Sequence, residues 1–450
     1  MPTNEAMIRI PEDARDILDK LCAAGFSAYV VGGCVRDSLS GIEPHDWDIC
    51  TSAFPEEVKH VFSGEHTIDT GLKHGTLTVM RHHVPYEVTT FRTDGEYTDH
   101  RHPDGVTFVR DLHEDLSRRD FTVNSMAYHP KTGLSDPFGG QRDLQAGIIR
   151  CVGDAQTRFT EDALRIIRAL RFASVFDFTI EEGTDAAIRE LYPTLSMVAA
   201  ERIWQEMQKL LCGKAVRRIL MAYPEVVTCL IPELKPTVGF DQRTPFHAYT
   251  VYEHIVRSVE AVPAVPALRL TMLLHDSGKP ESFTIDVHGI GHAHGHQAIS
   301  KAKAEKVTER LRVDGKTRDT VLTLVEKHDI LLTDERSLLL RRLRQMGETR
   351  LRQLIEVQRA DALAKGPEAP EHVEKVYKER CQALDNLLLE QPCFSLKSLA
   401  VNGRDLMAAG IPASPKLGAI LEALLADVME GKLPNEKEAL LKEAVQRSGM

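Results

Sequence analysis

The sequence has few features of a secreted or membrane-bound protein. Its eight cysteines are scattered over 450 residues without a C-x-x-C pair, which argues against a disulfide framework and against a thiolate zinc site. No stretch approaches the roughly 18 consecutive apolar residues of a spanning helix. The first residues lack the apolar core of a signal peptide. We therefore expect a cytoplasmic protein that does not bind a membrane.

Several common functional signatures are also missing. The chain has no Walker A loop, no Rossmann fingerprint, no zinc-protease helix and no internal repeat. Its formal net charge of −10 argues against indiscriminate nucleic-acid binding. Apolar residues make up 42% and charged residues 27%, as in ordinary globular proteins. A chain of 450 residues is too long for one core, so we expect two to four domains.

Strand-like and helix-like segments are divided unequally along the chain. Short segments rich in β-branched and aromatic residues lie at 28–31, 47–49, 76–80, 86–91 and 105–109. Beyond about residue 160, apolar residues recur with helical spacing. We expect an α+β fold, in which a head with a small mixed sheet precedes an all-α neck, body and tail. With Pro-rich breaks as boundaries, the predicted domains are residues 1–150, 151–235, 236–368 and 369–450.

The strongest local signal is a glycine turn followed by two aspartates. The segment GGCVRD at residues 32–37 follows a predicted strand and opens a helix, which offers free N–H groups and the positive helix end to a phosphate. Asp46 and Asp48 follow in the segment DWDI. In a strand, residues i and i+2 face the same side. Both carboxylates would then lie together, and Trp47 would turn into the core.

Two adjacent carboxylates are costly unless a cation lies between them. Carboxylate and triphosphate oxygens are the ligands that Mg²⁺ prefers, and a pair of such ions can activate a hydroxyl and stabilise leaving pyrophosphate. The sequence therefore predicts that Asp46 and Asp48 are catalytic ligands of two Mg²⁺ ions. Glu87, in a later predicted strand, is a candidate third carboxylate. The plainer interpretation of Glu87 is an exposed glutamate without such a role.

These motifs resemble those of class II (bacterial) CCA-adding tRNA nucleotidyltransferases, in the polymerase-β-like nucleotidyltransferase superfamily. Further segments agree in order and spacing: a flexible-loop segment at 91–103, SRRDFTVN at 117–124, DPFGG at 136–140 and EDALRIIRALRF at 161–172. The resemblance implies a polymerase-β-like head, a neck, and a tail that binds tRNA. It also implies sequential, template-independent transfer of CMP, CMP and AMP from CTP and ATP to the tRNA 3′ hydroxyl. No feature points to an obligate protein partner.

The last of these segments offers a physical basis for choosing bases. Asp162, Arg165, Arg168 and Arg171 are spaced by three, so on one helix they would form a stripe. Cytosine and adenine present an amino donor beside a ring-nitrogen acceptor, which Asp162 and Arg165 could bind in turn. Uracil and guanine present a carbonyl where the carboxylate needs a donor. The alternative is an Asp–Arg pair on a solvated helix face.

The resemblance also assigns roles to individual residues. It implies that the stripe binds the nucleotide and that phosphate is bound by Gly33, Arg36 and Arg119. Supporting roles fall to Gly32, Asp120 and Asn124. The segment at 200–207 resembles a helix that braces the active site, in which Trp204 and Met207 are interpreted as core residues.

A second constellation, rich in histidine, lies in the predicted body. The segment LLHDSGKP at residues 273–280 resembles the core of the HD superfamily, in which neighbouring His and Asp ligate a metal. This resemblance makes residues 236–368 an HD domain with a divalent transition metal and accessory phosphohydrolase activity. The alternative is a decayed HD fold kept as a scaffold. The candidate ligands are His254, His275, Asp276, His296 and Asp329.

Three other activities share part of these features with CCA addition. A poly(A) polymerase shares the head motifs, although the tail and the HD segment favour CCA addition. An enzyme that adds only the two cytidines is expected to lack the flexible loop, which is complete here. A metal phosphohydrolase with a nucleotide-sensing head would not need intact Asp46 and Asp48.

Overall fold

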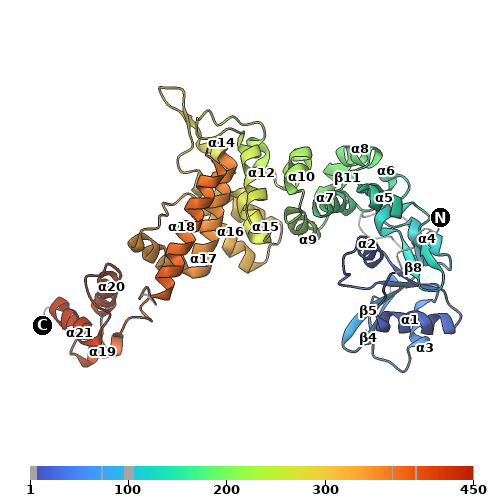
Figure 1. Ribbon diagram of the computed structural model, residues 1–450, viewed down its shortest axis with the longest axis horizontal. Helices are drawn as coiled ribbons and strands as arrows, with labels where there is room; N and C mark the ends of the chain where they lie inside the picture. Colours follow the sequence, from blue (N-terminus) through green and yellow to red (C-terminus); the bar gives the residue numbers. More distant parts are fainter. Residues whose placement is uncertain (1–7, 72–73, 96–105, 367, 391–392, 449–450) are drawn as a thin grey trace. The chain divides into compact units, whose positions relative to one another are not determined.

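The computed structural model describes residues 8–71, 74–95, 106–366, 368–390 and 393–448. The chain divides into two compact units, Met1–Pro232 and Glu233–Met450. A mixed sheet lies in the first unit and the second is mainly helical, which confirms the α+β class (Figure 1). Across the described residues, no helix is both long enough and apolar enough to cross a bilayer.

A seven-stranded mixed sheet forms the centre of the first unit's described residues. In spatial order its strands are β3 (Thr67–Gly71), β4 (Thr76–Arg81), β5 (Val84–Thr90), β2 (Ile49–Thr51), β1 (Ala28–Val31), β8 (Ala127–His129) and β9 (Gly133–Ser135). Strands β2 and β5 run parallel, and the other neighbours run antiparallel. The β-branched segments expected near β1, β4 and β5 are therefore strands, whose alternate side chains enter the core.

The strand expected at residues 47–49 begins only at Ile49. Asp46 and Asp48 therefore belong to the segment that leads into β2 and are not strand residues. The backbone is already held at the sheet, because the N–H of Val31 donates to the carbonyl of Asp48 over 3.0 Å. Trp47 packs against the core, as predicted.

Helices and short strand pairs complete the first unit. The helices are α1 (Glu12–Ala23), α2 (Gly33–Leu39), α3 (Pro55–Val61), α4 (Leu112–Ser117), α5 (Gly140–Ala146), α6 (Ala155–Glu161), α7 (Leu164–Phe176), α8 (Glu182–Leu191), α9 (Ala200–Leu211), α10 (Val216–Ala222) and α11 (Pro224–Leu230). The pairs are β6 (Arg92–Asp94) with β7 (Val106–Phe108), and β10 (Ile148–Ile149) with β11 (Thr179–Ile180). Apolar side chains of α1 pack on the sheet, and α7 packs on α9. Residues 96–103 of the expected flexible loop lie outside the described residues.

The second unit is built from helices and one short hairpin. Its helices are α12 (Val251–Ala261), α13 (Pro266–Leu274), α14 (Lys279–Ser282), α15 (His296–Arg310), α16 (Gly315–Lys327), α17 (Arg336–Lys365), α18 (Pro370–Leu389), α19 (Gly403–Ala408), α20 (Pro415–Met429) and α21 (Lys437–Ser448), and the hairpin joins β12 (Thr284–Ile285) to β13 (Gly291–His292). Helices α12, α17 and α18 lie side by side (Figure 1). Helix α17 is interrupted at Gly347, whose φ of 75° is left-handed. A small separate core joins α19, α20 and α21.

Candidate functional site

Three carboxylates lie near the start of β2, where the charges of Glu87 and Asp46 act on Asp48, although their oxygens do not all lie within 4.8 Å of one another. The parallel register pairs Ile49 with Val88, so the residues just before them, Asp48 and Glu87, are neighbours on adjacent chains. Loss of solvent around the carboxyl and the negative charge of Glu87 raise the pKa of Asp48; Arg119 opposes this and Asp46 adds to it. In the described part of the chain, none of the three acidic side chains forms a hydrogen bond or an ion pair. An all-oxygen set with excess negative charge suits Mg²⁺.

The glycine turn lies beside Arg119, from the segment that follows α4. Gly32 has a φ of 79°, and a Cβ at this position would lie 3.1 Å from Nη1 of Arg119. Arg119 donates from Nη2 to Asp115 over 3.2 Å, while its Nε is buried without a hydrogen-bond partner among the described residues. A guanidinium with an unused donor beside a glycine turn is suited to a phosphate oxygen.

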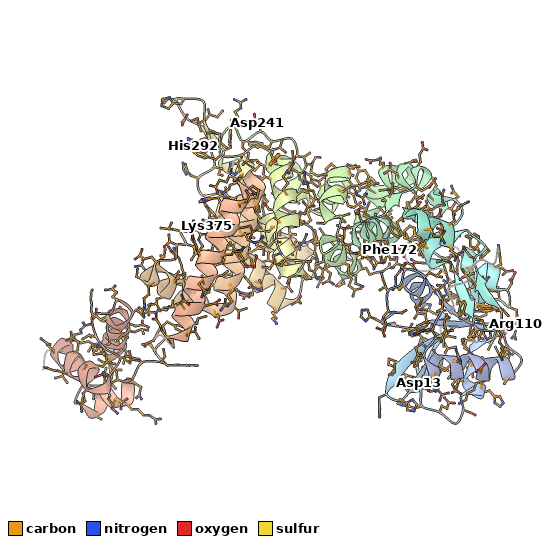
Figure 2. The ribbon with its side chains drawn as sticks, in the orientation of Figure 1. Asp13, Arg110, Phe172, Asp241, His292 and Lys375 are labelled. Atoms are coloured by element: carbon orange, nitrogen blue, oxygen red, sulfur yellow. The ribbon has the colours of Figure 1, made fainter. Side chains whose placement is uncertain are left out.

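Arg36 contacts protein groups on two sides. Its guanidinium is buried and donates to Asp37 over 2.9 Å and to Asn124 over 2.5 Å. It also lies 5.3 Å and 4.8 Å from the ring centroids of Phe172 and Phe176 on α7 (Phe172 is labelled in Figure 2). Arg36 therefore joins the glycine turn to α7.

An ion pair between the buried Asp120 and the half-buried Arg168 continues this connection. Nε and Nη2 of Arg168 donate to Oδ2 of Asp120 over 2.9 and 2.6 Å, and Asn124 donates to Oδ1 over 3.3 Å. Burial raises the pKa of the Asp120 carboxyl, but Arg168 outweighs this effect and leaves the pKa at about 2. Asp120 and Asn124, which were predicted to support the site, therefore connect the segment after α4 with α2 and with α7.

The helix expected over residues 161–172 is interrupted near its start. Helix α6 ends at Glu161, Asp162 has an extended backbone (φ −138°, ψ 102°), and α7 begins at Leu164. The Asp162 carboxylate accepts a hydrogen bond from the N–H of Leu164 over 3.0 Å, which caps α7 in place of a helix continuing through this position. Because of this cap, the predicted stripe holds for Arg165, Arg168 and Arg171 and not for Asp162.

Asp162 and Arg165, the two side chains predicted to recognise the base, each form hydrogen bonds with other residues. Oδ2 of Asp162 accepts from Nη2 of Arg202 on α9 over 2.9 Å. Arg165 donates to Oε2 of Glu161 over 2.7 Å and to the carbonyl of Arg118 over 3.1 Å. Both side chains are therefore oriented by neighbouring side chains and backbone before any nucleotide is present.

Arg171 forms an ion pair with Glu206 at 2.7 Å and lies 3.9 Å from the ring centroid of Phe172. Burial lowers the pKa of Arg171 to about 10, although Glu206 opposes this shift. Sequence reasoning missed Arg202 and Glu206 as site residues. Their spacing of four places both on one face of α9, a signal that could have identified them.

Asp115 was also missed. It is 1% exposed and contacts two arginines: Arg118 at 2.9 Å and Arg119 at 3.2 Å. Burial raises the pKa of Asp115, but the two guanidinium groups outweigh burial and lower it below the usual value. Its place three and four residues before the two arginines on a short helix was the available signal.

Four candidate metal ligands meet in the second unit. Nε2 of His254 lies 3.2 Å from Nε2 of His275, and both lie 3.1–3.2 Å from Oδ2 of Asp276. The fourth is Asp361 on α17, whose Oδ1 lies 3.1 Å from His254. We call these four residues the HD group. Sequence reasoning missed Asp361, which lies far along the chain from the HDSG segment and has no local motif.

The other two predicted ligands, His296 and Asp329, lie in different surroundings. His296 lies 3.1 Å from the other carboxylate oxygen of Asp276, whereas the exposed Asp329 accepts from Gln297 and belongs to neither cluster of potential ligands within the described residues. The side chain of the neighbouring His328 is buried instead, and its Nδ1 contacts the carbonyl of Val325. A cavity of about 280 Å³ opens beside the clusters. Its lining includes Phe240, Phe283, Lys279 and Lys365.

Comparison with known proteins gives consistent matches along the chain. Residues 28–150 match the family described as "Poly A polymerase head domain", 177–236 match "Probable RNA and SrmB-binding site of polymerase A", and 296–444 match a tRNA nucleotidyltransferase domain 2. The CCA-adding enzyme of Levilactobacillus brevis is 38% identical over 439 residues, which is 96% of this chain and 98% of that protein.

Solved structures agree over the same length. The chain is similar to the CCA-adding enzyme of Bacillus stearothermophilus in complex with CTP, with 31% identity, a TM-score of 0.69 and 97% of each chain covered. It is also similar to the Thermotoga maritima CCA-adding enzyme complexed with tRNA, with 22% identity, a TM-score of 0.58 and coverage of 97% and 96%. The second likeness concerns the fold alone.

Replacement of Asp120 by Asn should destabilise the protein in a pH-dependent way. At pH 7 the change removes one carboxylate partner of the half-buried Arg168, which keeps Glu206 at 3.5 Å, so we expect a loss of about 1.5–3 kcal/mol in the free energy of unfolding. Because the folded pKa of about 2 lies below the usual 3.8, the carboxylate stabilises the folded state above pH 4 and loses this effect as pH falls toward 2. The difference between wild type and variant should therefore shrink over that window.

Urea unfolding at pH 7, 4 and 2.5 measures this difference. Asp177→Asn is the matched control, because Asp177 is an exposed carboxylate in the left-handed region, which Asn tolerates. Equal destabilisation at all three pH values would contradict the role given to the Asp120 charge.

Proposed function

This chain belongs to the family of CCA-adding enzymes, and from that premise we propose that it builds or repairs the 3′ end of tRNA from CTP and ATP. In this reaction the tRNA 3′ hydroxyl attacks the α-phosphorus of the nucleotide and pyrophosphate leaves. The observation that carries the proposal is the convergence of Asp46, Asp48 and Glu87 beside the glycine turn. A primer-extension assay tests it, using tRNA that ends at the discriminator base and each nucleoside triphosphate in turn.

The carboxylates would hold the catalytic cations. Asp46, Asp48 and Glu87 supply oxygen ligands only, so we propose Mg²⁺. When bound, such ions lower the pKa of the attacking hydroxyl and balance the charge of the leaving pyrophosphate. Gly32 and Gly33 let the triphosphate approach the backbone, and the unused Nε of Arg119 supplies a donor for a phosphate oxygen.

In this proposal Arg36 does not bind phosphate directly. Its donors to Asp37 and Asn124 and its contact with Phe172 support a positioning role that keeps the glycine turn against α7. Arg168 acts in the same way through Asp120.

Base choice would rest on Asp162 and Arg165. A carboxylate oxygen can accept more than one hydrogen bond, so Asp162 can bind Arg202 and still accept from the amino group of cytosine or adenine. Arg165 would donate to the ring nitrogen beside it. The orienting contacts of both side chains support a preformed reading site, which loses little entropy when the nucleotide binds.

The full-length similarity to CCA-adding enzymes disfavours the other activities. A poly(A) polymerase shares the head, but the 38% identity extends over 96% of this chain. The domain boundaries at 150, 235 and 368 are also proposals: the matches over 28–150 and 177–236 are compatible with the first two, whereas the match over 296–444 runs across the third. The eight cysteines are free, which supports a reducing, cytoplasmic environment.

A second function is favoured by the HD group. Four buried or half-buried His and Asp side chains with ligand atoms within 4.8 Å of one another fit a transition ion better than Mg²⁺, because two of the donors are imidazoles. Lys279 and Lys365 line the cavity and pair with carboxylates of the HD group, at 2.7 Å from Asp276 and from Asp361, which places two ammonium groups where the anionic group of a phosphate ester would bind. We propose an accessory phosphohydrolase at this site.

Removal of either head carboxylate should abolish addition of every nucleotide. Asp46→Ala or Asp48→Ala should lower the rate for both CTP and ATP by more than about 100-fold, as expected for an essential catalytic group, while tRNA still binds in a gel-shift assay. Glu43→Gln, an exposed acid in the same loop, should leave the rate unchanged. A rate above about one hundredth of wild type in either alanine variant would overturn the assignment.

Asp162→Ala should change the choice of base. The variant should lose about 1–3 kcal/mol of transition-state stabilisation with CTP and ATP, the cost of an unpaired buried polar group. Misincorporation of UTP and GTP should rise relative to CTP and ATP, because the group that disfavours a carbonyl is gone. Single-nucleotide kinetics with all four triphosphates measure the ranking. An unchanged ranking would mean that Asp162 only caps α7.

His275→Gln should abolish phosphohydrolysis and leave CCA addition intact. The variant removes a ligand of the HD group, so hydrolysis of p-nitrophenyl phosphate with Mn²⁺ or Ni²⁺ should fall by more than about 100-fold. His288→Gln, an exposed histidine in the turn between β12 and β13 that does not line the cavity, is the control. Wild-type protein without any metal-dependent hydrolysis would favour the scaffold interpretation.

A further inference from the structure

Phe172 on α7, labelled in Figure 2, is contacted by three arginines. The central carbon of each guanidinium group lies near the centroid of its ring: Arg171 at 3.9 Å, Arg36 at 5.3 Å and Arg168 at 5.5 Å. Phe121 meets the same ring edge-on, with the two centroids 5.7 Å apart, and the Phe172 side chain is buried. One buried ring therefore contacts residues of α2, of the segment after α4 and of α7.

The three guanidinium groups are close enough to repel one another. Burial has the largest effect on the pKa of Arg171 and lowers it, and the positive charges of Arg168 and Arg36 lower it further. Carboxylates offset part of this repulsion, because Asp120 pairs with Arg168 and Glu206 pairs with Arg171. Each carboxylate, however, occupies the N–H groups that it binds.

An aromatic ring stabilises a cation without using its hydrogen-bond donors. The negative face of the ring attracts the positive charge, and the N–H groups stay available at the edge of the guanidinium. Arg36 lies over the ring of Phe172 in this way and still donates to Asn124. Arg168 likewise keeps two donors for Asp120. The ring thus adds to the hydrogen-bonded connection between α2 and α7 and does not compete with it.

We infer that Phe172 is a positioning residue for nucleotide transfer, whose negative ring face aligns the glycine turn with the helix that carries Arg165. The inference rests on the proposed CCA addition, in which the glycine turn receives the triphosphate and Arg165 binds the base. Phe172 acts through Arg36 and Arg168, whereas Asp162 and Arg165 keep their own partners. Weakening the ring face should therefore slow the transfer step and leave nucleotide binding and base choice unchanged.

Stepwise fluorination of Phe172 tests this inference without removing the ring. Mono-, di- and trifluorophenylalanine nearly keep the shape of phenylalanine but withdraw negative charge from the ring face in that order, so the contacts with the three arginines weaken at each step. The full-length protein is assayed for addition to tRNA with CTP and ATP. The kcat should fall at each step and reach a loss of about 10-fold with the trifluorinated ring, while KM and the ranking of the nucleotides stay within about twofold. Phe172→Leu should lose at least as much.

The same series at Phe159 on α6 is the matched control. Its side chain is also buried, and no guanidinium group lies over its ring within the described residues. Fluorination there should leave kcat unchanged, and circular dichroism with thermal unfolding establishes that each variant is folded. An unchanged kcat across the Phe172 series, a change confined to KM, or an equal decline at Phe159 would overturn the positioning role while CCA addition by the wild type stands. Wild type that adds no nucleotide would overturn the proposed function, and this inference with it.

Discussion

Buried charge that must be partnered is the constraint on which the first unit depends. Arg168 of α7 is held by Asp120, and the same carboxylate accepts from Asn124, which in turn accepts from Arg36 of α2. Removing any member leaves a desolvated polar group, which costs more than the pair itself contributes. The network therefore connects the glycine turn to the helix that carries Arg165, so the groups expected to bind phosphate and base belong to one rigid assembly.

Both candidate sites bring together several possible metal ligands, but the chemistry of these ligands differs. In the first unit the donors are carboxylates alone, partly open to solvent, and this set favours a hard ion that keeps water and accepts phosphate oxygens. In the HD group two imidazoles join two carboxylates, with His275 oriented through a backbone carbonyl, and this set favours a transition ion. The two groups of side chains therefore differ in the kind of ion that each would bind.

Backbone geometry sets the positions of these donors. The parallel register of β2 and β5 makes Asp48 and Glu87 neighbours although 38 residues separate them by number. Asp162 lies in the interruption between helices α6 and α7. Its carboxylate accepts a hydrogen bond from the N–H of Leu164 and so caps the start of α7. Sequence periodicity predicted one continuous helix at this point. The interruption of that helix therefore turns the carboxylate of Asp162 toward Arg202.

The sequence by itself determined the parts of this protein that depend on local pattern. The α+β class, the strands at β1, β4 and β5, the glycine turn with Asp46 and Asp48, and the family all follow from short motifs in their order. Only the tertiary structure decided the partners: Arg202 for Asp162, Glu206 for Arg171, and Asp361 and His328 in place of Asp329. These contacts join residues that lie far apart in the chain, and periodicity describes one element at a time. Which side chain meets which is settled when elements pack and every buried charge must find its partner.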